Sequence, residues 1–317
     1  MTDRRALLVD AFADEPLAGN AAGVVPDADD LTDEQMRAVA RELGASETAF
    51  VRSSPDADRR LRFFSPSAEV DLCGHATVAA HAHLHREGVL AAGVHAVETN
   101  AGVFDVEVEE GGVVWLAGAA PEVTEVEVDL GRVGDALGID PAALRDVGAD
   151  LPTAVASTGL PYLVVPVNFL ERLSGADPDD AAVAALAEEH GAAGVYAFTF
   201  DAIDRDSTLH GRAFVPALGV SEDPVTGTAS GAVAAYCRAV GAFDGDVPDE
   251  IRCEQGHFLD RPGVVRVRFG TGDDDGRDDT AGDDGDAGPV WVGGTAVTAL
   301  DGRLAVPDDD GDGIIEA

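Results

Sequence analysis

The stretch RFFSP at residues 62–66 recurs in the second half of the chain as RAFVP at residues 212–216. Each copy leads to a glycine turn, CGHAT at 73–77 and TGTAS at 226–230, and each turn opens an Ala-rich run of helical period. One such turn alone is an ordinary tight connection between a strand and a helix. Because the whole order of strand, loop, glycine turn and helix repeats, the sequence predicts two duplicated domains.

Short runs rich in Val, Leu and Phe alternate with Ala-rich stretches elsewhere too, a pattern typical of a mixed α/β (α+β) chain. Strands are expected at residues 6–12, 48–52, 103–108 and 162–167. Helices are expected at residues 32–43, 74–87, 177–190 and 227–240. Thr32 with Gln35 forms a capping-box pattern, and Pro178 is placed at the first position of its helix.

The repeat suggests an N-terminal half over residues 1–119 and a C-terminal half over residues 120–299, joined by a crossover at 117–122. A last strand at 290–300, around Gly293 and Gly294, is expected to return to the first half, which residues 300–317 can complete.

Two segments are too acidic and too poor in apolar side chains to pack. Residues 270–289 are expected to form a surface loop. The tail from Asp308 resembles a calcium loop but ends before the bidentate carboxylate, so a solvated acidic tail is favoured.

The two glycine-led helices place their N-termini at equivalent points of the two halves. Free N–H groups and the positive end of the helix dipole bind anions, and glycine permits close approach. If the halves face each other across a cleft, both termini point into it, which predicts a small substrate that carries a carboxylate.

The chain carries 60 acidic and 21 basic residues, a formal net charge of −39, and every basic residue apart from histidine is Arg. Repulsion among so many carboxylates would destabilise the folded state in dilute buffer, whereas concentrated salt screens this repulsion. We interpret the acidic surface as an adaptation to a halophilic cytoplasm. The charge also argues against a nucleic-acid partner.

The three cysteines have no disulfide or metal spacing, which favours a reducing compartment. No run of eighteen apolar residues occurs, so no membrane partner is expected. Together these features predict a cytoplasmic protein.

Glu47 is the leading candidate for chemistry, because it stands between a helix and an apolar strand, where a carboxylate is badly placed for packing. A carboxylate in a low-dielectric site can move a proton without cofactor or metal. His75 lies in the first turn of its helix and can orient or protonate a substrate group. Asp223 precedes the second glycine turn. For each of the three an ordinary surface, cap or turn role stays open.

Cys73 suggests a different chemistry, in which a thiol is the acid or base. At the mirror position the second half has Thr226, so the thiol is not duplicated. His81, His83 and His85 alternate, but on a helix only His81 and His85 share a face, so no metal site is expected.

Several long motifs, taken together, resemble the PhzF-like family of phenazine biosynthesis nearly from end to end. They are GNAAGVV at 19–25, GASETAF at 44–50, RFFSPSAEVDLCGHAT at 62–77, ASTGLPYLVV at 156–165, RAFVPALGVSEDPVTGTASGA at 212–232, EQGHFLDRPG at 254–263 and VGGTAV at 292–297. The resemblance implies the diaminopimelate-epimerase-like fold, with a sheet wrapped as a barrel around a central helix in each of two pseudo-symmetric domains and the active-site cleft between them.

The resemblance also implies roles. Glu47 corresponds to the family's proton-shuttling glutamate, and His75 and Asp223 to its partners. The substrate-binding residues would be Asn20, Ser46, Cys73, Gly74, Gly227, Thr228, Gly293 and Gly294. Thr228 stands where the family usually has serine, and Ala21 where it usually has proline.

The sequence and the resemblance together predict a cofactor-independent isomerase that moves a proton within a small carboxylate substrate. The resemblance alone implies a homodimer. Two alternatives stay open: a thiol-assisted epimerase or dehydratase of a hydroxyproline-like acid that uses Cys73, and a non-catalytic protein that binds a small anion.

Overall fold

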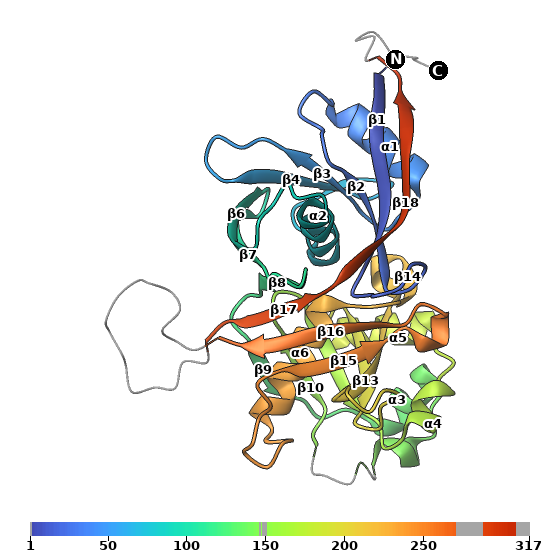
Figure 1. Cartoon of the computed structure of the whole chain (residues 1–317). Helices are drawn as coiled ribbons and strands as arrows, with labels where there is room; N and C mark the ends of the chain where they lie inside the picture. The colour runs from blue at the N-terminus through green and yellow to red at the C-terminus, as the bar shows by residue number, and fades with distance from the viewer. Residues whose placement is uncertain (1, 146, 148–150, 271–287, 309–317) are drawn as a thin grey trace, which may run out of the picture. The chain divides into compact units, whose positions relative to one another are not determined.

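The computed structural model describes residues 2–145, 147, 151–270 and 288–308 (Figure 1). The chain divides into two compact units. Unit 1 comprises Met1–Leu17, Ala21–Val114 and Thr295–Ala317, and unit 2 comprises Ala18–Asn20 and Trp115–Gly294. Residues 271–287 of the expected acidic loop and 309–317 of the acidic tail lie outside the described residues.

Unit 1 is a sheet with two helices. Its strands pair in the order β18-β1-β2-β3-β4-β6-β7, and the short β5 also pairs with β4. The β2–β3 and β4–β6 pairs are parallel, whereas β1–β18, β3–β4, β4–β5 and β6–β7 are antiparallel. The bounds are β1 Thr2–Ala11, β2 Asn20–Val25, α1 Asp33–Leu43, β3 Thr48–Arg52, β4 Arg59–Phe64, β5 Glu69–Val70, α2 Gly74–Arg86, β6 Gly93–Thr99, β7 Gly102–Val108 and β18 Ala296–Val306.

Unit 2 has the order β9-β10-β11-β12-β13-β15-β16-β17-β8, and the short β14 also pairs with β13. Its strands are β8 Val114–Ala117, β9 Glu122–Glu125, β10 Ala154–Ser157, β11 Pro161–Pro166, β12 Gly194–Thr199, β13 Leu209–Val215, β14 Val220–Asp223, β15 Ile251–Gln255, β16 Gly263–Phe269 and β17 Val290–Gly294. Its helices are α3 Leu130–Leu137, η1 Pro141–Leu144, α4 Leu170–Ser174, α5 Asp180–Glu189, η2 Pro216–Leu218, α6 Gly227–Ala239 and η3 His257–Leu259.

The strand pairings confirm the internal repeat. In unit 2, β11–β12 and β13–β15 are parallel, whereas β12–β13, β13–β14 and β15–β16 are antiparallel. These are the directions of the equivalent pairs in unit 1, and each unit places its glycine-led helix directly after the short strand. The two halves therefore share one topology.

The two glycine-led helices are the centres of their units. In α2 the nine residues from Ala76 to Leu84 are all buried, and in α6 the nine from Ala229 to Cys237 are all buried. Burial on every face requires strands on all sides, and Figure 1 shows the strands of unit 1 curving around α2. The alanines and glycines of both helices fit this demand, because small side chains let the strands approach closely.

The repeated R-x-F-x-P motif has a structural cause in each unit. The Arg62 guanidinium donates two hydrogen bonds of 2.7 Å to Glu69, and Arg212 donates bonds of 2.8 and 2.7 Å to Glu222. Each glutamate lies on the short strand, opposite the phenylalanine of the motif. The arginine thus fixes the short strand that leads into the central helix. The sequence pattern did not reveal the glutamates, because they stand at different spacings from their arginines.

Most expected elements are confirmed within one or two residues, and β3 matches its expected bounds. Thr32 and Gln35 form the capping box at the start of α1. The start of α5 was wrong: Pro178 precedes the helix, because the Asp179 side chain accepts a bond from the Ala182 N–H and makes Asp179 the N-cap. The expected strand at 290–300 is two strands that break at Thr295, with β17 in unit 2 and β18 in unit 1.

Candidate active site

Glu47 is held in place by its main chain. Helix α1 ends at Leu43 and is capped by Gly44, which has a φ of 68° and donates its N–H to the carbonyl of Ala40. The carbonyl of Glu47 then accepts a 2.9 Å bond from the N–H of Gly23 on β2. A Cβ at Gly23 would lie 2.3 Å from Oγ1 of Thr48, so only glycine permits this approach. Gly23, the second glycine of the GNAAGVV motif, thus anchors the turn that carries Glu47.

Four side chains of unit 1 gather at the start of α2. Sγ of Cys73 lies 3.4 Å from Nδ1 of His75 and 3.9 Å from Oε2 of Glu47. Nε2 of His75 lies 3.6 Å from the same Glu47 oxygen and 3.3 Å from Oγ of Ser46. A carboxylate, a thiol, an imidazole and a hydroxyl therefore meet at separations of 3.3 to 3.9 Å.

The cluster is only partly exposed, which suits a site that must bind a ligand and limit water. The side chains of Glu47 and His75 are 25% and 13% exposed, and Cys73 is buried. The side chain of Cys73, the N-cap residue of α2, does not cap its own helix. The first N–H groups of α2 therefore keep their capacity to bind an anion, and the helix dipole favours a carboxylate there.

A second network fills the start of α6 in unit 2. Oδ1 of Asp223 accepts a 3.0 Å bond from the Asn20 amide, and Oδ2 accepts a 2.5 Å bond from the Thr226 hydroxyl. The Asn20 amide also donates to the carbonyl of Val225 at 2.9 Å. Asp223 therefore accepts hydrogen bonds at both oxygens.

Asn20 joins this network because residues 18–20 belong to unit 2. The Arg261 guanidinium donates to the carbonyls of Ala18 and Gly19, at 2.7 and 2.9 Å. The N–H of Gly19 donates in turn to the carbonyl of Pro262 at 2.9 Å. The short segment that carries Asn20 is thus fixed from both sides.

Gln255 is a member of the network that the sequence analysis missed. Its amide nitrogen donates to the main-chain carbonyl of Asp223 at 2.7 Å and to Oγ1 of Thr226 at 3.1 Å. The N–H of Thr226 donates back to Oε1 of Gln255 at 3.3 Å. Gln255 belongs to the EQGHFLDRPG motif, which also contains Arg261. That shared motif was the available signal, although nothing in it named these partners.

The other expected binding residues differ in their surroundings. Oγ1 of Thr228 lies 3.0 Å from the hydroxyl of Tyr162, whose pKa burial raises well above its ordinary value. Gly293 and Gly294 end β17, where Gly293 pairs with Arg266 of β16. Their proposed contact with substrate stays a prediction.

The three cysteines differ in what surrounds them. Burial raises the pKa of the Cys253 thiol to about 12 and that of Cys237 further still, so both stay protonated at neutral pH. Cys73 instead lies beside an imidazole and a carboxylate. Glu47, Cys73 and His75 place one ligand atom each within 4.8 Å of one another, so they are also able to hold a metal ion.

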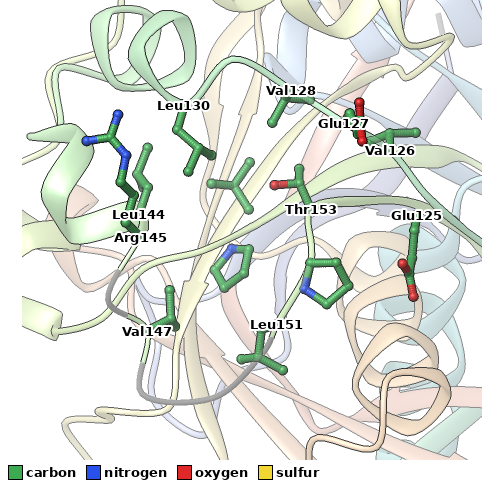
Figure 2. Close-up of a pocket in the computed structure, with 13 residues that line it drawn as sticks. Glu125, Val126, Glu127, Val128, Leu130, Leu144, Arg145, Val147, Leu151 and Thr153 are labelled. Carbon is green, nitrogen blue, oxygen red and sulfur yellow. The ribbon is translucent and has the colours of Figure 1, made fainter.

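A pocket of about 780 Å³ lies in unit 2, between β11 and the segments that flank α3 (Figure 2). Apolar side chains such as Val126, Leu130 and Val165 form its walls, with Glu125 and Arg145 among its polar residues. None of the site residues expected from the sequence lines it. We therefore assign it no part in the chemistry.

No helix within the described residues is long and apolar enough to cross a membrane.

Comparison with known proteins adds a family to this geometry. Residues 9–302 match the family model PhzC-PhzF, described as "Phenazine biosynthesis-like protein". The chain is 38% identical over 274 residues to the protein of Bacillus subtilis named "Uncharacterized isomerase YfhB", an alignment that covers 85% of this chain and 92% of the relative.

Solved structures agree. The crystal structure of the Bacillus anthracis phenazine biosynthesis protein of the PhzF family superposes with a TM-score of 0.84 at 31% identity, covering 96% of this chain and all of that one. A hydroxyproline epimerase from Agrobacterium vitis, solved with trans-4-hydroxy-L-proline, matches with a TM-score of 0.54 at 14% identity, over 97% of this chain and 94% of that one. The second likeness shows a shared fold.

Proposed function

The chain belongs to the phenazine biosynthesis-like family and is an isomerase, and from this premise we propose that Glu47 moves a proton between two carbon atoms of a small carboxylate substrate. The observation that carries the proposal is the cluster of Glu47, Cys73 and His75 at the uncapped start of α2. It joins a proton acceptor to an anion-binding helix end.

In the proposed reaction the Glu47 carboxylate takes a proton from a carbon of the substrate. The C–H bond breaks, and its electron pair moves into an adjacent π system of the substrate. Protonated Glu47 then returns the proton to a different carbon, and the double bond shifts. Atoms and electrons balance within the substrate and the glutamate, so the step calls for no external oxidant, reductant or cofactor.

His75 has a supporting role in this scheme. Its Nε2 lies near both Ser46 and Glu47, so the imidazole is able to donate to a substrate oxygen as charge develops there. The first N–H groups of α2 would bind the substrate carboxylate. In unit 2 we assign Asn20 to substrate binding and Asp223 to catalysis, and the support is the hydrogen bond that joins them near the start of α6.

The test is a screen for solvent deuterium in D₂O at high KCl, with cyclic acids, α-hydroxy acids and amino acids followed by NMR. Wild type is expected to place deuterium at a carbon of its substrate, and Glu47→Gln is expected to lose at least about a hundredfold in exchange rate. Glu42→Gln, an exposed position on α1, is the matched control and is expected to exchange as wild type does. Exchange that persists in Glu47→Gln would refute the proposal, and binding without exchange in wild type would favour a non-catalytic anion-binding protein.

A second candidate, a thiol-assisted epimerase or dehydratase, is favoured by the 3.4 Å distance between Sγ of Cys73 and Nδ1 of His75. An imidazole at this range is able to take the thiol proton and activate the sulfur. The mirror residue Thr226 donates its hydroxyl to Asp223, so the second half has no comparable base at that point. This candidate requires that Cys73→Ala abolish exchange, whereas the Glu47 scheme requires that substantial exchange remain.

The setting of the enzyme is also a proposal. We infer a cytoplasmic protein, supported by three buried cysteines that form no disulfide, and a homodimer, which sedimentation would test. We further infer that it works at high salt, because the net charge of −39 is then screened. An unfolding temperature that does not rise with KCl would contradict this inference.

A further inference from the structure

A second group of side chains with metal-ligand chemistry lies in unit 2, in the segment that contains Gln255. His210 on β13 and Glu254 on β15 are opposite one another in a parallel pair of strands. His257 follows two residues after Gln255, in η3. A nitrogen of each imidazole and a carboxylate oxygen of Glu254 lie within 4.8 Å of one another.

Two imidazole nitrogens of this group have no hydrogen-bond partner among the described residues. Nδ1 of His210 lies 2.8 Å from Oε1 of Glu254, and the Glu254 carboxylate also accepts from the N–H groups of Ile203 and Asp204. Nε2 of His210 and Nδ1 of His257 are both buried, and neither has a hydrogen-bond partner within the part of the chain that the structure describes. The two rings are neighbours, with centroids 5.2 Å apart.

Two buried, unpartnered imidazole nitrogens in neighbouring rings are costly unless something binds them. His81 and His83 each have an unpartnered nitrogen too, but neither belongs to a group of ligand atoms in the described residues. What distinguishes His210 and His257 is therefore that their rings are neighbours within one such group, together with a carboxylate already bonded to one ring. A carboxylate that holds the far nitrogen of a histidine is the usual second shell of a metal-binding imidazole.

We propose that His210 and His257 bind a divalent transition metal ion of the zinc type, with Glu254 orienting the ring of His210. Imidazole nitrogens select zinc, cobalt, nickel or copper over magnesium or calcium. His210 is fully buried whereas His257 is partly exposed, so the ion enters past His257 and solvent completes its coordination.

The charges around the site agree with a cation. Burial opposes ionisation of Glu254, but the bonds from His210 and from the two main-chain N–H groups outweigh it and lower the pKa of Glu254 to about 2. Burial also lowers the pKa of His257. The negative charges of Glu254 and Asp204 both act on His257.

The consequence is structural, because the metal ion would fix the chain on both sides of Gln255. Gln255 in turn bonds to Asp223 and Thr226, so the ion would hold the network at the start of α6 in place. The proposal does not depend on the reaction assigned to Glu47.

The test is a titration of the chelator-treated full chain with Co²⁺, followed by absorption spectroscopy. We expect one equivalent of Co²⁺ with visible d–d bands and without the near-ultraviolet charge-transfer band of a thiolate ligand, since this site contains no cysteine. His257→Ala is expected to weaken binding at least about tenfold. His95→Ala, which removes a partly exposed imidazole bonded to a main-chain carbonyl, is expected to bind as wild type does.

Cys73→Ala separates this site from the cluster in unit 1, where a thiol is among the possible ligands. Unchanged binding in Cys73→Ala supports the proposal. Binding that is lost in Cys73→Ala, a thiolate charge-transfer band, or equal affinity in wild type and His257→Ala would each overturn it. As a second measurement, Zn²⁺ is expected to raise the unfolding temperature of wild type and of Cys73→Ala but not that of His257→Gln.

Discussion

The two arginine–glutamate pairs of the repeat predict different costs for the same substitution. Arg212 and Glu222 are nearly enclosed, with side chains 7% and 9% exposed. Arg62 and Glu69 are 11% and 24% exposed, and Arg62 has a second carboxylate partner in Asp33 at 2.6 Å.

Glu222→Gln leaves the Arg212 guanidinium buried beside a neutral amide. Arg212 keeps its bonds to the carbonyls of Leu173 and Ala176, both 3.0 Å, but its charge has lost the partner in this pair. Breaking a buried pair costs about 3–5 kcal/mol, and the retained bonds place this case near about 3 kcal/mol. Glu69→Gln leaves Arg62 paired with Asp33 in a wetter site, so about 1 kcal/mol is expected.

The distribution of chromophores makes the measurement selective. Both tryptophans, Trp115 and Trp291, and all three tyrosines belong to unit 2. Tryptophan fluorescence therefore follows the unfolding of unit 2, and far-ultraviolet circular dichroism adds unit 1. With an m-value of about 2 kcal/mol/M in urea, Glu222→Gln should lower the urea midpoint of the fluorescence transition of unit 2 by about 1.5 M. Glu69→Gln should lower the midpoint of the unit 1 transition, seen by circular dichroism, by about 0.5 M. Equal midpoint shifts, or a larger one for Glu69→Gln, would refute the assignment of the difference to burial.

Two further predictions concern other buried positions. Burial lowers the pKa of His81 from 6.5 to about 4, so the contribution of the neutral ring to folding stability is complete above about pH 6.5 and is lost as the pH falls through about 4. Urea unfolding followed by circular dichroism at these two pH values should show that the free energy of unfolding falls by about 3 kcal/mol more in wild type than in His81→Leu. Equal falls in the two proteins would contradict this prediction. At Gly256 the φ is 85° and a Cβ would lie 2.2 Å from the carbonyl oxygen of Arg261, so Gly256→Ala should destabilise unit 2 by at least about 3 kcal/mol. Gly191→Ala, at a φ of 67° in open space, should cost only about 1 kcal/mol in the same fluorescence assay, and similar costs for the two would show that the contact at Gly256 is unimportant.

The repeat and the period of the apolar residues were enough to predict the fold class and the bounds of several elements. The central helices were predictable because an Ala-rich run after a glycine turn occurs twice, and the structure confirms that both are buried on every face. The start of α5 was not predictable, because Pro178 and Asp179 are both common at helix starts. Only the hydrogen bond from the Ala182 N–H to the Asp179 side chain shows that Asp179 is the N-cap. Helix α3 was missed although Asp129 and Gly138 are its caps, because its apolar run is short.

The site was predictable only as a set of residue types. The sequence placed Glu47 in one motif and both Cys73 and His75 in another, and the convergence of the two motifs depends on the strand order that brings the end of α1 beside the start of α2. Gln255 and Arg261 carried no signal beyond their shared motif. Both side chains donate hydrogen bonds to main-chain carbonyls. Every residue has such a carbonyl, so the residue type of the acceptor does not reveal the bond.

The two halves share a topology but differ in chemistry at equivalent positions, and this difference argues for an acid–base role in unit 1. His75 and Thr228 occupy the same place after their glycines, yet His75 lies among a carboxylate, a thiol and a hydroxyl, whereas Thr228 contacts a buried tyrosine hydroxyl. Cys73 and Thr226 are likewise equivalent, but the Thr226 hydroxyl is already committed to Asp223. Unit 1 thus has a carboxylate, a thiol and an imidazole together at its helix start, whereas at the helix start of unit 2 the carboxylate of Asp223 accepts hydrogen bonds from Asn20 and Thr226. This asymmetry favours the proposed proton shuttle at Glu47 of unit 1.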